Sequence, residues 1–469
     1  MLQTKSVQLL VALFAAVAPA SLSADPVDDY VRTEMARHQV PGLALAILRH
    51  GVLQRAQGYG YANLEHDVPV HPDTVFKSGA LGMQFTAVAA MLLVEEGKLR
   101  LDESVRTYLP EAPSSWAPIT IKNLLNHTSG LPATPNGEFR TDYTDDELLG
   151  IIYKQDLNYP AGARWRFSYT DYIALGFITR KVSGKFYADL LAERVFGPLG
   201  MRTARSIDEL AIVPNRAAGY ELRENKLRNA EWVSPTANST ADGSLYLSIL
   251  DYARWDAAII ARQILTRESW ALISRPAQLA NGRTYPYGFG WFLNESAGQG
   301  MWSHSGSWQG FKTSVVRYIG DELTIVVFEN GDGGDPEAIA RHVAGMVEPK
   351  LASPPAAPIP DPTPGRGDRV RDLLLHIATG SADYRGFAYV SNQDFADMTA
   401  DYRSLLTPLG APGEIALFDQ RDLGTDQVSR YRARYDKAVI EIRIAYAADG
   451  RVASLDMAPV SDWTAPIQR

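Results

Sequence analysis

Cysteine is absent from the 469 residues of this sequence. Its absence excludes disulfide bonds, thiolate metal sites, a cysteine nucleophile and a lipidated N-terminal cysteine. Histidine is also scarce: the eight histidines are scattered, and none shows the H-E-x-x-H spacing of a zinc site. We therefore expect no metal ion and no cofactor.

Basic residues are the minority among the charged side chains, with 46 lysines and arginines against 54 aspartates and glutamates. The net charge of −8 opposes a polyanionic partner, so nucleic acid is disfavoured.

Long apolar runs are scarce as well. Beyond residue 24 no segment approaches the roughly 20 consecutive apolar residues that span a bilayer, and we expect no transmembrane segment in the mature chain.

The first 24 residues have the pattern of a secretory signal peptide. A polar start carrying Lys5 precedes an apolar run over 7–17 and a small-residue stretch that ends at Ala24. A buried core helix is the alternative interpretation of the apolar run, but the terminal position and the small-residue exit favour the signal peptide. We expect residues 1–24 to be removed and the mature protein to be periplasmic or secreted.

A proline-rich stretch divides the rest of the chain. The sequence LASPPAAPIPDPTP at 351–364 holds six prolines, which fix φ, remove amide donors and favour an extended spacer. A proline-rich recognition motif is the alternative. The sequence predicts a first domain over 25–350, a linker over 351–367 and a second domain over 368–469.

Residues 25–350 mix strand and helix patterns without regular alternation. Apolar strands are expected at 43–48 and within 313–330, and a buried helix is expected over 84–99, where Gly97 marks its end. Because βαβ alternation is missing, the patterns favour an α+β fold.

The region after the linker predicts a second, small α+β domain. Helices are expected within 369–378 and 392–410, followed by strands. Ile440, Ile442, Ile444 and Tyr446 alternate along one strand face, and Asp449-Gly450 supplies a tight hairpin turn. The role of this domain is left open.

Six separated blocks of the first domain match one known family. They are VPGLALAILRHG at 40–51, DTVFKSGALGMQFTA at 73–87, LLNHTSGLP at 124–132, RVFGPLGM at 194–201, YGFGW at 287–291 and HSGSWQGF at 304–311. In order and spacing they resemble the serine β-lactamase-related family, which includes penicillin-binding proteins, D-aminopeptidases and esterases. The resemblance implies an antiparallel sheet flanked by helices plus a helical subdomain, acyl transfer through a serine nucleophile, and a bacterial periplasm as the compartment.

The nucleophile position is changed in this sequence. The family signature S-x-x-K places a serine and a lysine one helical turn apart, on the same face of a helix start. Here Ala80 stands at the serine position and Met83 at the lysine position. A methyl group has no lone pair, and a thioether is no useful proton acceptor near neutral pH.

The other two family signatures are altered or partly retained. At the Y-x-N signature the sequence has Phe167 and Tyr169, so the phenolic oxygen that relays protons in the family is missing. The edge-strand signature survives as the tripeptide that begins at His304. Backbone amides of Ala80 and Ser307 therefore still offer an oxyanion hole, since they do not depend on side chains.

These motif positions define the candidate site. The motif-equivalent catalytic positions are Ala80, Met83, Phe167, Tyr169 and His304, and the expected ligand-binding residues are Ala80, Tyr169, His304, Gly306, Ser307 and Trp308. Trp165 and Trp302 are further candidates for an aromatic wall around a ligand, with core packing as the alternative. Ser78 and Ser168 are weak candidates for a displaced nucleophile. His127 is expected to satisfy loop hydrogen bonds.

The sequence predicts a non-catalytic protein that binds a small molecule or peptide, with a cell-envelope fragment as the candidate ligand. The alternative is an esterase, amidase, peptidase or glycoside-acting hydrolase with an altered mechanism around His304. A third hypothesis is a scaffold with a vestigial cleft. The oligomeric state is left open.

Overall fold

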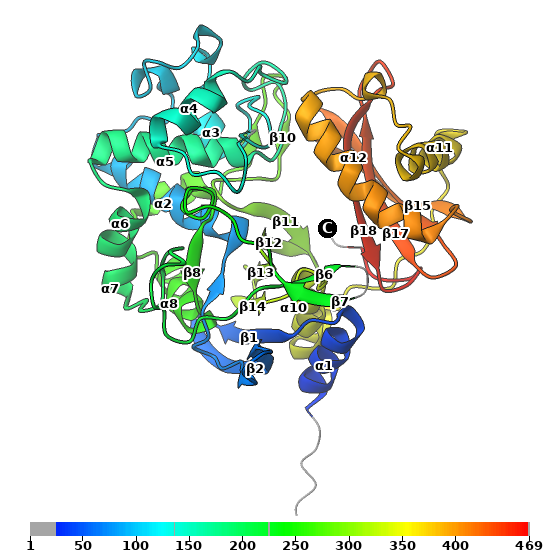
Figure 1. Ribbon diagram of the computed structural model, residues 1–469, viewed down its shortest axis with the longest axis horizontal. Helices are drawn as coiled ribbons and strands as arrows, with labels where there is room; N and C mark the ends of the chain where they lie inside the picture. The colour runs from blue at the N-terminus through cyan, green and yellow to red at the C-terminus, as the bar shows by residue number, and fades with distance from the viewer. Residues whose placement is uncertain (1–24, 136, 224–225, 468–469) are drawn as a thin grey trace, which may run out of the picture.

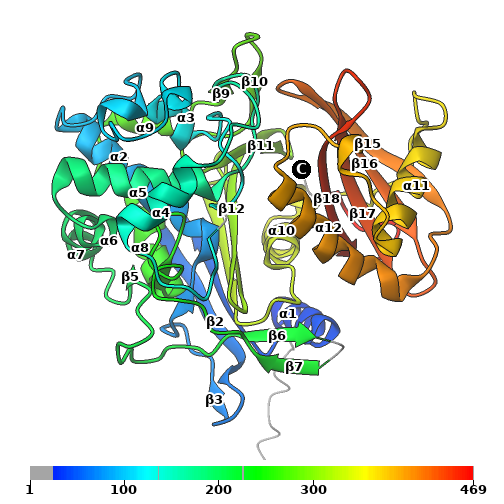
Figure 2. The ribbon, with the colours of Figure 1, turned by 45° about the horizontal axis from the view of Figure 1, so that its top comes forward.

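The computed structural model describes residues 25–135, 137–223 and 226–467. The predicted signal peptide lies outside these residues. None of the described helices is both long and apolar enough to cross a membrane. The chain folds into a larger domain and a smaller sheet domain beside it, drawn in orange and red in Figures 1 and 2.

An antiparallel sheet forms the centre of the larger domain. Within the described residues its order is β11 (Phe292–Ser296), β12 (Gln299–Trp308), β13 (Phe311–Tyr318), β14 (Leu323–Glu329), β1 (Gly42–Arg49), β2 (Val52–Asn63) and β3 (Val68–Pro69). The strand predicted at 43–48 is confirmed as the middle of β1. The apolar pattern over 313–330 forms two strands rather than one, because a turn at 319–322 folds β14 back onto β13.

The two faces of β1 pack against different layers. Leu43, Leu45 and Ile47 face α1 (Pro26–His38) and α10 (Pro336–Val347). Ala44 and Ala46 face the larger core beneath the helical subdomain. Both faces of this strand are therefore buried, which explains why its sequence is apolar throughout rather than alternating.

The helical subdomain covers the second face of the sheet (Figure 1). Its helices are α2 (Met83–Glu95), α3 (Ile121–Leu125), α4 (Asp145–Tyr153), α5 (Tyr169–Ser183), α6 (Tyr187–Leu191), α7 (Gly197–Leu199), α8 (Ile249–Ile260) and α9 (Arg267–Ile273). Short strands connect them: β4 (Phe76–Lys77), β5 (Arg205–Ser206), β6 (Tyr220–Arg223), β7 (Lys226–Asn229), β8 (Leu245–Leu247), β9 (Ala277–Gln278) and β10 (Thr284–Tyr285). The buried helix predicted over 84–99 is α2, which stops at Glu95 before the turn at Gly97.

The smaller domain is a four-stranded antiparallel sheet with two helices. The strands are β15 (Ile415–Leu423), β16 (Asp426–Arg434), β17 (Val439–Tyr446) and β18 (Val452–Val460), and the helices are α11 (Arg366–Thr379) and α12 (Asn392–Leu406). Ile440, Ile442 and Ile444 share its core with residues of both helices, as the alternating pattern predicts. The α+β fold class and the small C-terminal domain are thus confirmed.

The proline-rich segment runs along the smaller domain. Ile359 donates its amide to the carbonyl of Leu417 at 2.8 Å, and Ala356 donates to Thr464 at 3.0 Å. The segment has no helix or strand between Leu351 and Arg366, as its prolines require. It therefore adds an irregular edge to the smaller domain, while the exact domain boundaries stay a prediction.

Candidate functional site

Ala80 lies on η1 (Gly79–Gly82), the single 3₁₀ turn that leads into α2. The preceding residue, Gly79, has φ +53°, and a Cβ on it would stand 2.5 Å from the amide nitrogen of Ser307 on β12. Only glycine allows this approach, because any side chain would displace the strand. The close packing brings residue 80 next to the end of β12.

Two further glycines close around the same turn. A Cβ on Gly306 would stand 2.8 Å from the amide nitrogen of Leu81, and a Cβ on Gly243 would stand 2.9 Å from Cα of Ala80. The backbones of η1, β12 and the loop before β8 are therefore in direct contact. This contact fixes the position of Ala80 independently of its own side chain.

The amide of Ser307 points away from β13. The hairpin turn between β12 and β13 consists of Gln309 and Gly310, both with positive φ, and Trp308 pairs with Phe311 as the closing pair. Hydrogen-bonded and non-bonded pairs alternate along an antiparallel ladder, so the next pair, Ser307 with Lys312, leaves the Ser307 amide free of its neighbour strand. It lies beside η1, where a Cβ on Gly79 would stand 2.5 Å from it, while the oxyanion hole stays a prediction.

A cavity of about 260 Å³ opens above this point. Four of the predicted ligand-binding residues line it: Ala80, Tyr169, Ser307 and Trp308. The rest of its wall comes from the loop at 134–143, from α4 and α5, and from the segment 234–244. The wall is predominantly apolar. His304 and Gly306 are not among the described residues that line it.

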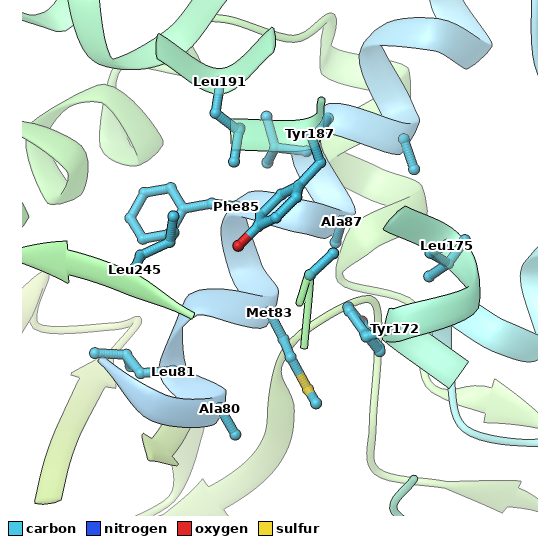
Figure 3. Packing of buried hydrophobic residues seen from close by; sticks show 14 of the residues in the cluster. Ala80, Leu81, Met83, Phe85, Ala87, Tyr172, Leu175, Tyr187, Leu191 and Leu245 are labelled. Carbon is cyan, nitrogen blue, oxygen red and sulfur yellow. The ribbon is translucent and has the colours of Figure 1, made fainter. Parts of the chain in front are cut away.

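Met83 and Phe167 also lie outside this cavity. Figure 3 shows the Ala80 methyl and the Met83 side chain leaving the same side of the chain, as residues one helical turn apart should. Met83 is completely buried in the core of the helical subdomain. The ring of Phe167 packs edge to face against Tyr169, with centroids 5.1 Å apart, and its other side borders a second cavity between the domains.

His304 is buried away from the cavity lining, in an aromatic cluster with Phe167, Tyr287 and Phe292. Its Nδ1 lies 2.7 Å from the carbonyl oxygen of Ser305, and its Nε2 lies 3.1 Å from the hydroxyl of Tyr287. Nδ1–H therefore donates and Nε2 accepts. Burial lowers the pKa of His304 to about 4, so the ring is neutral at physiological pH.

The remaining candidates have structural contacts. Ser78 donates its hydroxyl to the carbonyl of Gly243 at 2.5 Å, and Ser168 caps the start of α5 while donating to Pro132 at 2.7 Å. His127 is fully buried with Nδ1 3.0 Å from Oδ2 of Asp171, and its own carbonyl accepts the amide of Arg166. It holds the loop before α5, as the sequence suggested.

The predicted aromatic wall is divided between two places. Tyr169 and Trp308 line the cavity, whereas Trp302 packs against Trp291 with ring centroids 5.9 Å apart. Trp165 stacks on Tyr285 at 3.9 Å and borders the cavity between the domains. Only the first two can touch a ligand above Ala80.

The smaller domain docks beside the loop that forms part of the cavity wall. Oδ1 of Asp394 on α12 accepts the hydroxyl of Thr134 at 3.2 Å, and its Oδ2 accepts the amide of Ala133 at 3.3 Å. Arg164 forms an ion pair with Asp426 and lies 4.0 Å above the ring centroid of Tyr389. A cavity of about 450 Å³ lies between the two domains.

Some wall residues carry no motif that sequence analysis could detect. Phe139, Tyr143 and Asp242 line the cavity from segments that none of the family blocks includes. Phe139 and Tyr143 share one loop and Asp242 comes from another, so the three side chains meet only through the packing of two loops, and no local spacing marks them.

Comparison with known proteins identifies the family of the larger domain. The family model described as beta-lactamase matches residues 27–348. The chain belongs to the β-lactamase family. This family consists of serine hydrolases, and penicillin-binding proteins and D-aminopeptidases are among the relatives found.

Two curated relatives illustrate the β-lactamase-family match. Penicillin-binding protein 4* of Bacillus subtilis is 30% identical over 314 residues, which cover 63% of this chain and 69% of that protein. A D-aminopeptidase of Brucella canis is 25% identical over 329 residues, or 68% of this chain and 61% of that protein.

Solved structures agree with the fold. An octameric penicillin-binding protein homologue from Pyrococcus abyssi matches with a TM-score of 0.62 and 23% identity, covering 93% of this chain and 96% of that one. The D-amino acid amidase of Ochrobactrum anthropi SV3, solved with L-phenylalanine amide, matches with a TM-score of 0.58 and 23% identity over 70% of this chain and 98% of its own. The first match extends over both domains.

Proposed function

We propose that this protein is a non-catalytic member of the β-lactamase family that binds a small molecule or peptide in the cavity above Ala80. The observation that carries the proposal is the methyl group of Ala80 on η1, at the place where the family motif has its serine. The predicted signal peptide supports a role outside the cytoplasm, with a cell-envelope fragment as the ligand.

The surroundings of Ala80 support the same conclusion. Met83 contributes a thioether buried among apolar side chains, and Phe167 contributes a ring without a hydroxyl. Among the described residues that line the cavity there is no lysine, arginine or histidine to activate a hydroxyl group. The backbone amides of Ala80 and Ser307 can still bind a carbonyl oxygen, so recognition does not require catalysis.

Amide or peptide hydrolysis by another mechanism is the second candidate, and the relatives named D-aminopeptidase and D-amino acid amidase favour it. The candidate general base for such hydrolysis, from the sequence, is His304. Its ring nitrogens are both hydrogen-bonded within the protein, and His304 is not among the described residues that line the cavity. A hydrolytic role for His304 therefore needs a rearrangement of the wall.

The test is covalent labelling and turnover of the purified full chain. A fluorescent penicillin and a fluorophosphonate probe should label it no more than a heat-denatured sample. A panel of chromogenic esters and D-amino acid anilides should show no turnover. Hydrolysis that disappears in His304→Ala but persists in His50→Ala, a matched change at an exposed histidine, would establish the second candidate instead.

A further inference from the structure

The ionisable side chains of the cavity above Ala80 are all acidic or phenolic. Among the described lining residues they are the carboxyl groups of Glu138 and Asp242 and the phenols of Tyr143 and Tyr169. No described cation faces the cavity to pair with an anionic ligand. A carboxylate-bearing ligand would be repelled by these two carboxyl groups in an otherwise apolar wall, whereas a cation would find opposite charge.

Asp242 occupies a distinctive place in this wall. It directly precedes Gly243, whose backbone packs against Cα of Ala80, so its carboxyl group lies beside the turn that carries the motif position. Oδ1 of Asp242 is buried and has no hydrogen-bond partner among the described residues. The hydroxyl of Thr240 is a hydrogen-bond partner of the carboxyl group. The residue's own amide is a second partner, so the negative charge of this cavity-lining carboxylate has no cation beside it in the described lining, and a cationic group in the cavity would supply the opposite charge.

Aromatic rings form much of the remaining wall. Phe139 is 53% exposed and packs edge to face against Trp308, with ring centroids 5.8 Å apart. Tyr143 and Tyr169 add two further rings. Such rings bind apolar groups by burial, and their faces attract cations. At about 260 Å³ the cavity suits a ligand about the size of one amino-acid residue.

We propose that this cavity binds a small amphipathic amine, whose primary ammonium group pairs with Asp242 while its apolar or aromatic body lies among the rings of Phe139, Tyr169 and Trp308. The proposal rests on the binding function proposed above and names the chemical class of its ligand. A terminal carboxylate is not the expected ligand group, because the described residues that line the cavity include no cation to pair with it.

The pH dependence of binding follows from the groups around Asp242. Burial raises the pKa of Asp242 to about 6. Two phenols interact electrostatically with Asp242. Burial raises the pKa of Tyr169 on α5 to about 12, and it raises the pKa of Tyr187 on α6 well above its ordinary value. Glu138 lies elsewhere on the cavity wall. Both phenols stay neutral between about pH 5 and 8, so the protonation of Asp242 controls how ligand affinity changes over this range. Protonation of Asp242 removes the charge that attracts the ammonium group, and affinity should fall as the pH drops below about 6.

The test compares three probes that share a phenyl group and differ in charge: phenethylammonium, 2-phenylethanol and 3-phenylpropanoate. Calorimetric titration of the full chain near pH 7.5 should show phenethylammonium binding at least about tenfold more tightly than either of the others. Asp242→Asn, which keeps the side-chain shape, should remove this preference, and the matched variant Glu138→Gln should retain it. Between about pH 7.5 and 5 the wild-type affinity for phenethylammonium should fall, with its midpoint near the pKa of Asp242.

Equal affinity for the three probes, no binding of any of them, or a preference unchanged in Asp242→Asn would each overturn the proposal. If Asp242→Asn fails to fold, the pH profile of the wild-type protein decides, and an affinity that does not fall below about pH 6 overturns it. Release of ammonia from phenylalanine amide is measured in parallel. Such release would contradict the non-catalytic function while leaving the ammonium preference to be judged on the three probes.

Discussion

The amide nitrogen of Ser307 lies 2.5 Å from the position that a Cβ on Gly79 would take. Strand β12 and the turn η1 are therefore in backbone contact, and this contact sets the distance between the amides of Ala80 and Ser307. Any side chain at residue 79 must separate them.

Gly79→Ala should destabilise the fold by more than about 2 kcal/mol, because a positive φ is unfavourable for alanine and the new Cβ overlaps backbone atoms. Gly97→Ala is the matched control. Gly97 has φ +70° but nothing within 4 Å of its notional Cβ, so its cost should be limited to about 1–2 kcal/mol. Urea unfolding of both variants measures the difference, and equal costs would show that the β12 contact is not tight.

Ala80→Ser alone should not restore labelling by a fluorescent penicillin. The new hydroxyl would have no lysine at residue 83 and no phenol at residue 167 to move its proton. The triple variant Ala80→Ser, Met83→Lys, Phe167→Tyr should label, since it restores the family groups at their motif positions. Strong labelling of the single variant would reveal a different base close to residue 80.

The free energy of unfolding should fall as the pH rises between about 4.5 and 8, because Glu329 is protonated in the folded chain over this range. This side chain is completely buried at the end of β14, neither carboxyl oxygen has a hydrogen-bond partner among the described residues, and burial raises its pKa from 4.5 to about 8. Between these values the unfolded chain has lost the proton that the folded chain keeps, so rising pH favours unfolding. Urea midpoints of the wild type and Glu329→Gln across this range measure the effect, which should be smaller in the variant; parallel pH curves would contradict it.

Asp426→Asn should weaken the docking of the smaller domain. The ion pair of Asp426 with Arg164 is largely buried, with side-chain exposures of 15% and 12%, so the substitution leaves a guanidinium without its anion. We expect a loss of roughly 1–3 kcal/mol. Glu231→Gln is the control, because its pair with Arg140 is 69% and 64% exposed and should contribute less than about 1 kcal/mol. Thermal unfolding that remains unchanged in Asp426→Asn would show that the pair does not hold the domains together.

Local sequence patterns determined much of the fold. The isoleucines of β17 alternate because one face of that strand is buried, whereas β1 and α2 are marked by unbroken apolar runs because they are buried on nearly all sides. The family motifs added the order of the elements. They also located Ala80, Tyr169, Ser307 and Trp308, which the fold brings to one cavity.

Tertiary structure alone decided which side chains face that cavity and which do not. His304 and Trp308 lie four residues apart on β12, so alternation places both on one face, yet Trp308 lines the cavity and His304 does not, because Phe167, Tyr287 and Phe292 enclose the His304 ring. Asp242 comes from a loop without a motif and reaches the wall because Gly243 packs against η1. Its environment depends on contacts between segments far apart in the chain, and such contacts leave no periodic trace in the sequence.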